Sequence, residues 1–303
     1  MQSLIYDLDQ AKKFYDKVID TPREAFDADF FCVAARKKYM TQEDRERTRL
    51  GDTCMMKKTA LKQADSSVFL NKLRETDAGL DWLTSLNGEY IPRSCMVFYM
   101  NVNHTNMAKG IQSFKKDLVD LDTELSNVIF KHAKLEDIGY KVKNLANIAM
   151  KAYQDPKNVT DKTWIDLDLD VFEWNSLTPE DVFPVIREYD ARKLNTSEIE
   201  LLETQLLAMS LARCYVIKTH GGLHILVSTA WFKHANKIKA ESRSKEKLSR
   251  FDFMNLEELK HLLETRLQEK CTYKEFEINQ NMMVPIPGTL QGGVEVKFYE
   301  EKR

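Results

Sequence analysis

The segment from Trp164 to Phe172 constrains the fold more than any other part of the chain, because its sequence, WIDLDLDVF, alternates between apolar and acidic side chains. Side chains of a β-strand point to opposite faces in turn, so this pattern predicts a strand with one aliphatic and one acidic face. Asp166, Asp168 and Asp170 then share the acidic face. Like charges at this spacing destabilise a strand, so we expect a compensating cation.

Carboxylate oxygens of this kind suit Mg²⁺ or Mn²⁺. A plainer interpretation is a solvated strand face opposite a core face of Ile165, Leu167 and Leu169. Composition argues against it, because aspartate has a low β-propensity and a solvated face usually mixes Thr, Lys, Glu and Gln. The acidic face is therefore a candidate site for divalent cations.

Glycine marks two further segments. The chain of 303 residues has only 10 glycines, yet they recur in KTHGGLH, residues 218–224, and in PIPGTLQGG, residues 285–293. Glycine is needed where the backbone turns at positive φ or approaches a ligand closely. These segments are therefore candidate binding loops.

The first glycine segment joins two predicted strands, Cys214 to Lys218 and Leu223 to Val227, as a hairpin. His224 lies one residue into the second strand, where a histidine can bond a phosphate oxygen. A tight hairpin with a core histidine explains the pattern equally well. In the second segment, the hydroxyl of Thr289 and the amide of Gln291 can meet a base, sugar or phosphate, or simply decorate a β-turn.

Charge and cysteine content exclude several classes of protein. Lys and Arg number 45 against 47 Asp and Glu, so bulk nucleic-acid binding by net charge is excluded, but a local basic patch is not. Candidates to hold a phosphate backbone, rather than to form a solvated helix face, are Arg36, Lys38, Lys237, Lys239 and Arg243. The five cysteines show no CxxC, and no apolar run is long enough to span a membrane, so we expect a cytoplasmic protein without disulfides or a cysteine zinc site.

The remaining patterns predict an α+β chain with a mixed or antiparallel sheet. Residues 40–66 show no clear period. Helices are expected over 8–19, 67–76, 105–133 and 136–154, from Thr178, from Asn195 or Thr196, and within 229–270; strands are expected over 30–39 and 96–102, with a last strand pair over 281–286 and 294–299.

Taken in order, WIDLDLD, THGGLH and PIPGTLQGG resemble the catalytic core of the archaeo-eukaryotic primase superfamily, the primase-polymerases of phages, plasmids and mobile elements. The resemblance covers residues 160–300. It implies a catalytic core over residues 91–303, with an RRM-like mixed or antiparallel sheet flanked by helices. Residues 1–90 would form a helical or mixed N-terminal accessory module.

The resemblance also implies roles for single residues. Asp166 and Asp168 would hold two catalytic Mg²⁺ or Mn²⁺ ions, although the register also allows Asp168 and Asp170, and His224 would contact the incoming nucleotide. For the third carboxylate of the family, Glu277 is the first candidate and Asp252 the second. The other candidate nucleotide contacts are Thr219, Gly222, Thr289 and Gln291.

The implied activity is template-directed nucleotidyl transfer, as a DNA primase, a DNA polymerase or both. The partners would be a DNA template and primer, ribonucleoside or deoxynucleoside triphosphates, and a separate helicase and single-strand-binding protein, in the bacterial cytoplasm if the chain is phage-encoded. The arginine that often precedes PGT in the family is absent, because Met283, Val284 and Pro285 stand there. The alternative is therefore a catalytically weak or inactive replication initiator or single-stranded-DNA-binding protein on the same fold.

Overall fold

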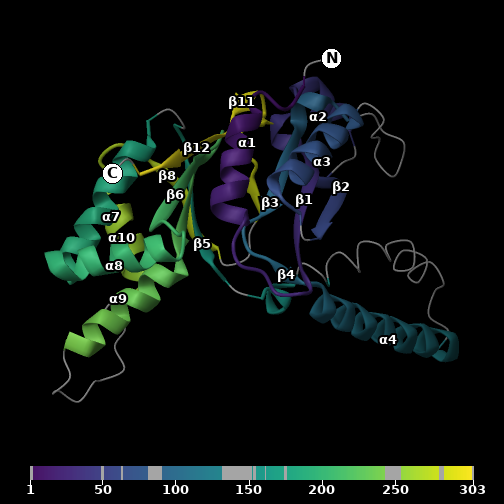
Figure 1. Ribbon diagram of the computed structural model, residues 1–303. Coiled ribbons are helices and arrows are strands. Elements are labelled where there is room, and N and C mark those ends of the chain that lie inside the picture. The colour runs from purple at the N-terminus through teal and green to yellow at the C-terminus, as the bar shows by residue number, and fades with distance from the viewer. Residues whose placement is uncertain are drawn as a thin grey trace.

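The computed structural model shows two antiparallel sheets, each of five strands, with helix α1 (Leu8–Phe14) between them (Figure 1). A continuous buried cluster of apolar side chains extends through both sheets. The structure describes residues 3–48, 51–62, 64–80, 91–131, 152, 155–160, 162–173, 176–242, 254–279 and 283–301.

The first sheet has the order β2-β1-β3-β9, and the short β4 also pairs with β1. Its central strand β1 is buried along almost its whole length because it has neighbours on both edges. Helices α1 and α3 pack together beside this sheet, and Phe69 of α3 contacts Tyr15 with ring centroids 4.7 Å apart. The bounds are β1 Asp27–Arg36, β2 Thr53–Lys62, α3 Ser66–Ala78, β3 Met96–Asn101, β4 Thr105–Asn106 and β9 Met283–Pro285.

The second sheet has the order β12-β6-β7-β5-β8. One face lies toward α1, where Phe14 contacts Phe298 with ring centroids 5.9 Å apart. Four helices, α7 to α10, lie on the other side of the sheet (Figure 1). The bounds are β5 Trp164–Val171, α7 Pro179–Lys193, α8 Thr196–Ala208, β6 Cys214–Lys218, β7 Gly222–Ser228, α9 Thr229–Ser242, α10 Leu256–Leu267, β8 Tyr273–Asn279 and β12 Lys297–Glu300.

Smaller elements connect the sheets. A π-helical turn, Tyr15–Ile19, extends α1, and a 3-10 turn, Lys37–Tyr39, leads from β1 to α2 (Gln42–Arg47). Helix α4 (Met107–Lys131) projects from the body of the molecule (Figure 1). The loop before β12 carries a small ribbon of β10 (Leu290–Gln291) and β11 (Val294–Glu295), and 3-10 turns lie at Arg93–Cys95 and Pro156–Asn158.

The structure confirms the predicted fold class at the level of an α+β chain with antiparallel sheets flanked by helices. The alternating strand and the glycine hairpin form as expected, and α7 begins where Thr178 donates its backbone N–H to Asp181. All described ladders between strands are antiparallel. The primase-polymerase core remains a prediction.

Three expectations about the strands were wrong. β2 lies within the segment expected to be irregular, and β8 was not predicted. Both are edge strands, so solvent reaches part of each. In β2, TCMMKKTALK, the apolar alternation is also weak. The last two strands do not pair: β9 joins β3 in the first sheet, whereas β12 joins β6 in the second.

The predicted division of the chain at residue 90 does not coincide with a gap between sheets, because β3, after it, pairs with β1, before it. The helix expected over 136–154 lies almost wholly outside the described residues. In the described part of the chain, no helix combines the length and the apolar character needed to cross a bilayer.

Candidate metal centre

The acidic face of β5 lies beside two other strands whose register brings chemically active side chains next to it. Asp168 stands opposite His224 of β7 on one side and opposite Glu277 of β8 on the other. Directly opposed residues of an antiparallel pair have Cβ atoms about 5 Å apart. The sequence predicted these three residues to act together, and the structure makes them neighbours across three strands.

The closest contacts join His224 to two aspartates. Its Nδ1 lies 2.9 Å from Oδ2 of Asp166 and 3.5 Å from Oδ1 of Asp168. One potential ligand atom from each of the three residues lies within 4.8 Å of the others, so Asp166, Asp168 and His224 could hold a metal ion. Asp170, the third aspartate expected to bind metal, does not belong to this group and lies instead beside Gly221.

Asp166 has the property that best fits a bound cation. The residue is only 1% exposed, and its Oδ1 is buried with no hydrogen-bond partner among the described residues. Leaving a buried carboxylate oxygen without a partner is costly, so such atoms are rare in folded proteins. A divalent cation would supply the missing interaction, and two carboxylates with an imidazole are a suitable donor set.

The cluster carries more negative than positive charge. Burial raises the pKa of Asp168 to about 6, against the lowering effect of His224, and the carboxylates of Asp166, Asp170 and Glu277 raise it further. Burial alone would lower the pKa of His224, but Asp166 and Asp168 outweigh it and raise that pKa to about 9. Without a metal ion, His224 is therefore protonated near neutral pH and shares its proton with the aspartates.

Glycine allows the hairpin to approach the acidic strand. A Cβ atom on Gly222 would collide with the carbonyl oxygen of Leu169, and one on Gly221 would lie 2.6 Å from Oδ1 of Asp170. The hydroxyl of Thr219 accepts from the backbone N–H groups of both glycines at 3.3 Å. Thr219 is thus engaged inside the turn, and its predicted contact with a nucleotide is untested, as is that of Gly222.

The proline-glycine loop reaches the same hairpin. Oε1 of Gln291 accepts from the backbone N–H of His220 at 2.9 Å, whereas the buried Thr289 donates its hydroxyl to the carbonyl of Ile286 at 2.7 Å. Gly292, with φ +60°, packs against Tyr39, whose ring also lies 5.1 Å from that of His220. The acidic strand, the hairpin and the loop therefore converge, and a turn of the first sheet joins them.

That turn brings Lys38 toward the acidic cluster, and Arg36 precedes the turn at the end of β1. Arg36 donates to the hydroxyl of Tyr99 at 3.2 Å, and its Nε is buried without a hydrogen-bond partner. Burial lowers the pKa of Lys38, Arg36 lowers it further, and Asp170 and Asp168 act in the opposite direction, so the ammonium lies within electrostatic reach of both aspartates. Neither Arg36 nor Lys38 forms an ion pair with any residue that the structure describes.

The other basic candidates lie elsewhere. Lys237 and Lys239 belong to α9, which lies on the side of the second sheet away from α1 (Figure 1). The strand register places Asp168 on the α1 side, because it shares a face with Phe298, which contacts Phe14. Lys239 forms an ion pair with Glu198 at 2.9 Å. Arg243, and Asp252 as the second candidate for the third carboxylate, lie outside the described residues. The structure does not bring Lys237 or Lys239 to the metal centre, and their role in DNA binding stays a prediction.

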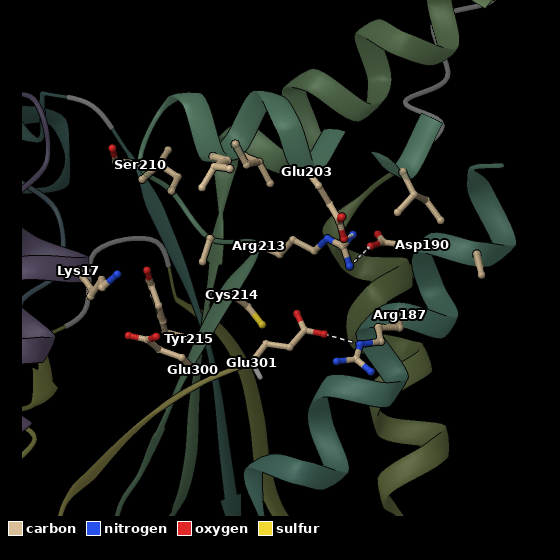
Figure 2. Close-up of a pocket in the computed structure, with 16 residues that line it drawn as sticks. Lys17, Arg187, Asp190, Glu203, Ser210, Arg213, Cys214, Tyr215, Glu300 and Glu301 are labelled. Atoms are coloured by element: carbon tan, nitrogen blue, oxygen red, sulfur yellow. Dashed lines mark hydrogen bonds and ion pairs between the residues drawn. The ribbon is translucent and has the colours of Figure 1, made fainter. Parts of the chain in front are cut away.

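A separate hollow of about 1020 Å³ lies between α7, α8 and the start of β6 (Figure 2). Its charged side chains point at one another: Arg213 lies 3.1 Å from Asp190, and Arg187 lies 2.5 Å from Glu301. Both arginines therefore have carboxylate partners, although both oxygens of Asp190 are buried without a hydrogen bond among the described residues.

Sequence reasoning missed Tyr39 and Tyr99, which connect the first sheet to the site, and also Glu275, which stands opposite Asp170 on β8. The alternation Glu275-Phe276-Glu277 was a usable signal for β8. No local signal points to the tyrosines, because their role depends on how the two sheets meet.

Comparison of the chain with family models, curated proteins and solved structures finds no match. The fold and the site themselves define an α+β protein of two antiparallel sheets with a buried Asp-Asp-His cluster that could bind a metal ion.

Proposed function

We propose that this chain is a divalent-cation-dependent nucleotidyltransferase that synthesises nucleic acid on a DNA template, as a primase, a polymerase or both. One observation carries the proposal: a buried cluster with excess carboxylates lies within electrostatic reach of Lys38, and Arg36, which acts on Lys38 in turn, has no described carboxylate partner. A nucleoside triphosphate complexed with divalent cations has the charge distribution that satisfies both sides.

On the acidic side, Asp166 and Asp168 would hold the cations, with Glu277 next to Asp168 as a further carboxylate. When bound, the cations would activate the 3′-hydroxyl of the primer and neutralise charge on the leaving pyrophosphate. These residues would fix the place of reaction, because Asp166 is buried and its register on β5 is held by strands on both sides.

On the basic side, Arg36 and Lys38 would bind the phosphates. A guanidinium donates to phosphate oxygens with two parallel hydrogen bonds, and lysine binds phosphate as a point charge. Arg36 is the last residue of β1, and its guanidinium donates a hydrogen bond to the hydroxyl of Tyr99 on β3. This bond helps to hold the side chain in place. The acidic side chains of the second sheet and the basic side chains of the first would therefore bind opposite sides of the same triphosphate.

Primer extension tests this proposal. The full chain is incubated with a primed single-stranded DNA template, deoxynucleoside or ribonucleoside triphosphates, and Mn²⁺ or Mg²⁺. We expect synthesis by the wild-type chain and at least about a thousandfold loss in the double variant Asp166→Asn, Asp168→Asn, since both cation ligands are removed. Asp16→Asn is the matched control, because Asp16 forms only an exposed pair with Lys12.

Two results would refute the proposal: no synthesis by the wild-type chain with any template or cation, or full activity in the double variant. If the wild-type chain binds single-stranded DNA in a gel-shift assay but never extends a primer, the non-catalytic initiator or DNA-binding protein becomes the better description.

A further inference from the structure

His224 occupies an unusual place for a residue expected only to touch a nucleotide. Its ring is buried, with the residue 8% exposed, and its Nδ1 faces two carboxylates at once. One of these, Asp166, also has a buried oxygen without a hydrogen-bond partner. The imidazole is therefore one of the three groups that could bind the metal ion.

The distances fit a shared ion. In octahedral coordination with bonds of about 2.1 Å, neighbouring ligand atoms lie about 3 Å apart and opposite ones about 4.2 Å. Nδ1 of His224 lies 2.9 Å and 3.5 Å from the nearest oxygens of Asp166 and Asp168, and all three ligand atoms lie within 4.8 Å of one another. Small side-chain adjustments would place all three around one cation.

We infer that His224 releases its Nδ1 proton to solvent and binds the cation directly through Nδ1, which makes the site a mixed nitrogen and oxygen centre that prefers a first-row transition metal to Mg²⁺. Mg²⁺ favours oxygen ligands only, whereas imidazole is a good ligand for transition metals. The inference rests on one part of the proposed function, that a divalent cation binds at Asp166 and Asp168, and does not require polymerase activity. It leaves Nε2 of the ring available for contact with a nucleotide.

The other buried histidine with an aspartate partner provides an internal control. Nδ1 of His104 lies 2.6 Å from Oδ1 of Asp29, but Arg23 lies 3.0 Å from the second oxygen of that carboxylate. Nε2 of His104 meets the hydroxyl of Thr21 at 2.8 Å. With every ring nitrogen and carboxylate oxygen engaged, this pair has no position for an ion.

Pulsed electron paramagnetic resonance of bound Mn²⁺ tests the inference without any reaction. The full chain is produced with ordinary and with ¹⁵N-labelled histidine and loaded with Mn²⁺ at a substoichiometric ratio. We expect nuclear coupling from a directly bound imidazole nitrogen that changes with the label. Measurement on the wild-type chain keeps the test valid even if a variant fails to fold.

Variants assign the signal. His224→Asn puts an amide oxygen where Nδ1 was, so we expect retained binding of Mn²⁺ without imidazole coupling. Calorimetry should show that the wild-type chain binds Mn²⁺ roughly tenfold or more tightly than Mg²⁺, and that His224→Asn narrows this ratio. His104→Asn should keep the coupling and the ratio.

The outcomes separate this inference from the proposed function. Mn²⁺ bound without imidazole coupling refutes the inference and leaves metal-dependent nucleotidyl transfer intact. Coupling that persists in His224→Asn also refutes it. Coupling that is present in the wild-type chain and lost in His224→Asn supports it, even if primer extension fails. No binding of Mn²⁺ at all refutes both.

Discussion

Each sheet of this protein carries a buried aspartate paired with a histidine, and the two pairs differ in what surrounds them. On the first sheet, Oδ1 of Asp29 contacts His104, and Oδ2 is bonded by Arg23 at 3.0 Å and by the hydroxyl of Tyr15 at 3.2 Å. Each carboxylate oxygen therefore has a partner, and the guanidinium of Arg23 balances the negative charge.

On the second sheet, the same two residue types form an unbalanced site. Asp166 bonds His224 through Oδ2 and leaves Oδ1 without a partner in the described part of the chain. The neighbouring carboxylates of Asp168, Asp170 and Glu277 increase the excess of negative charge. A hydrogen-bonded Asp-His pair is therefore not in itself a sign of function. We expect function where excess charge and a carboxylate oxygen without a partner lie beside such a pair.

The largest effect on stability should come from breaking the pair of Asp29 and His104 on the first sheet, whose charge Arg23 balances. Asp29→Asn leaves Arg23 and His104 buried without a carboxylate, which should lower the free energy of unfolding by about 3–5 kcal/mol. Urea denaturation measures this change, with the exposed Asp16→Asn as the control. A loss within error of the control would contradict the view that the first pair is a structural element.

Removing the carboxylate of Asp168, beside the second pair, should change the free energy of unfolding in the opposite direction. Burial and neighbouring carboxylates raise the pKa of Asp168 to about 6, so keeping it ionised at pH 7.5 opposes folding. In the absence of divalent cations, Asp168→Asn should therefore raise the free energy of unfolding by about 1–3 kcal/mol, while it weakens the binding of Mn²⁺. Destabilisation of the ion-free chain would contradict the unbalanced description.

The pH dependence of stability should also distinguish the pairs. The pKa of His224 is raised to about 9 in the folded chain, above its ordinary value of 6.5. Its contribution to stability is therefore fully present below pH 6.5 and is lost as the pH rises through 9. We expect urea midpoints of the ion-free chain to fall across this window, and to fall less in His224→Asn, whose amide does not titrate.

The smallest effect is expected at the outer end of the balanced pair. Thr21→Val removes the hydroxyl that meets Nε2 of His104, which should cost about 1 kcal/mol of stability. Calorimetric titration with Mn²⁺ should give the same affinity as for the wild-type chain. A changed affinity would mean that the two sheets are coupled more tightly than their separate hydrogen-bond networks suggest.

The sequence was informative where the signal is local. Strict alternation predicted β5 and its acidic face, and the paired glycines predicted the hairpin that carries His224, because both patterns depend on neighbouring residues only. The first candidate for the third carboxylate, Glu277, does stand beside Asp168, although its strand was not predicted.

The sequence could not reveal how the sheets meet. Nothing near Lys38 or Tyr39 in the chain indicates that these residues lie close to an acidic strand far away in sequence. The roles of Thr289 and Gln291 were equally hidden, because their partners, a nearby carbonyl and the backbone of His220, depend on the path of the folded loop.

The segment from β9 to β12 contributes a strand to the first sheet and then a strand to the second. During translation, these residues leave the ribosome after every other strand of both sheets, so neither sheet can be completed before β8 has been made. The contact between Gln291 and His220 would then be among the last to form, so a nascent chain without this segment would lack the junction at which we propose that a triphosphate binds.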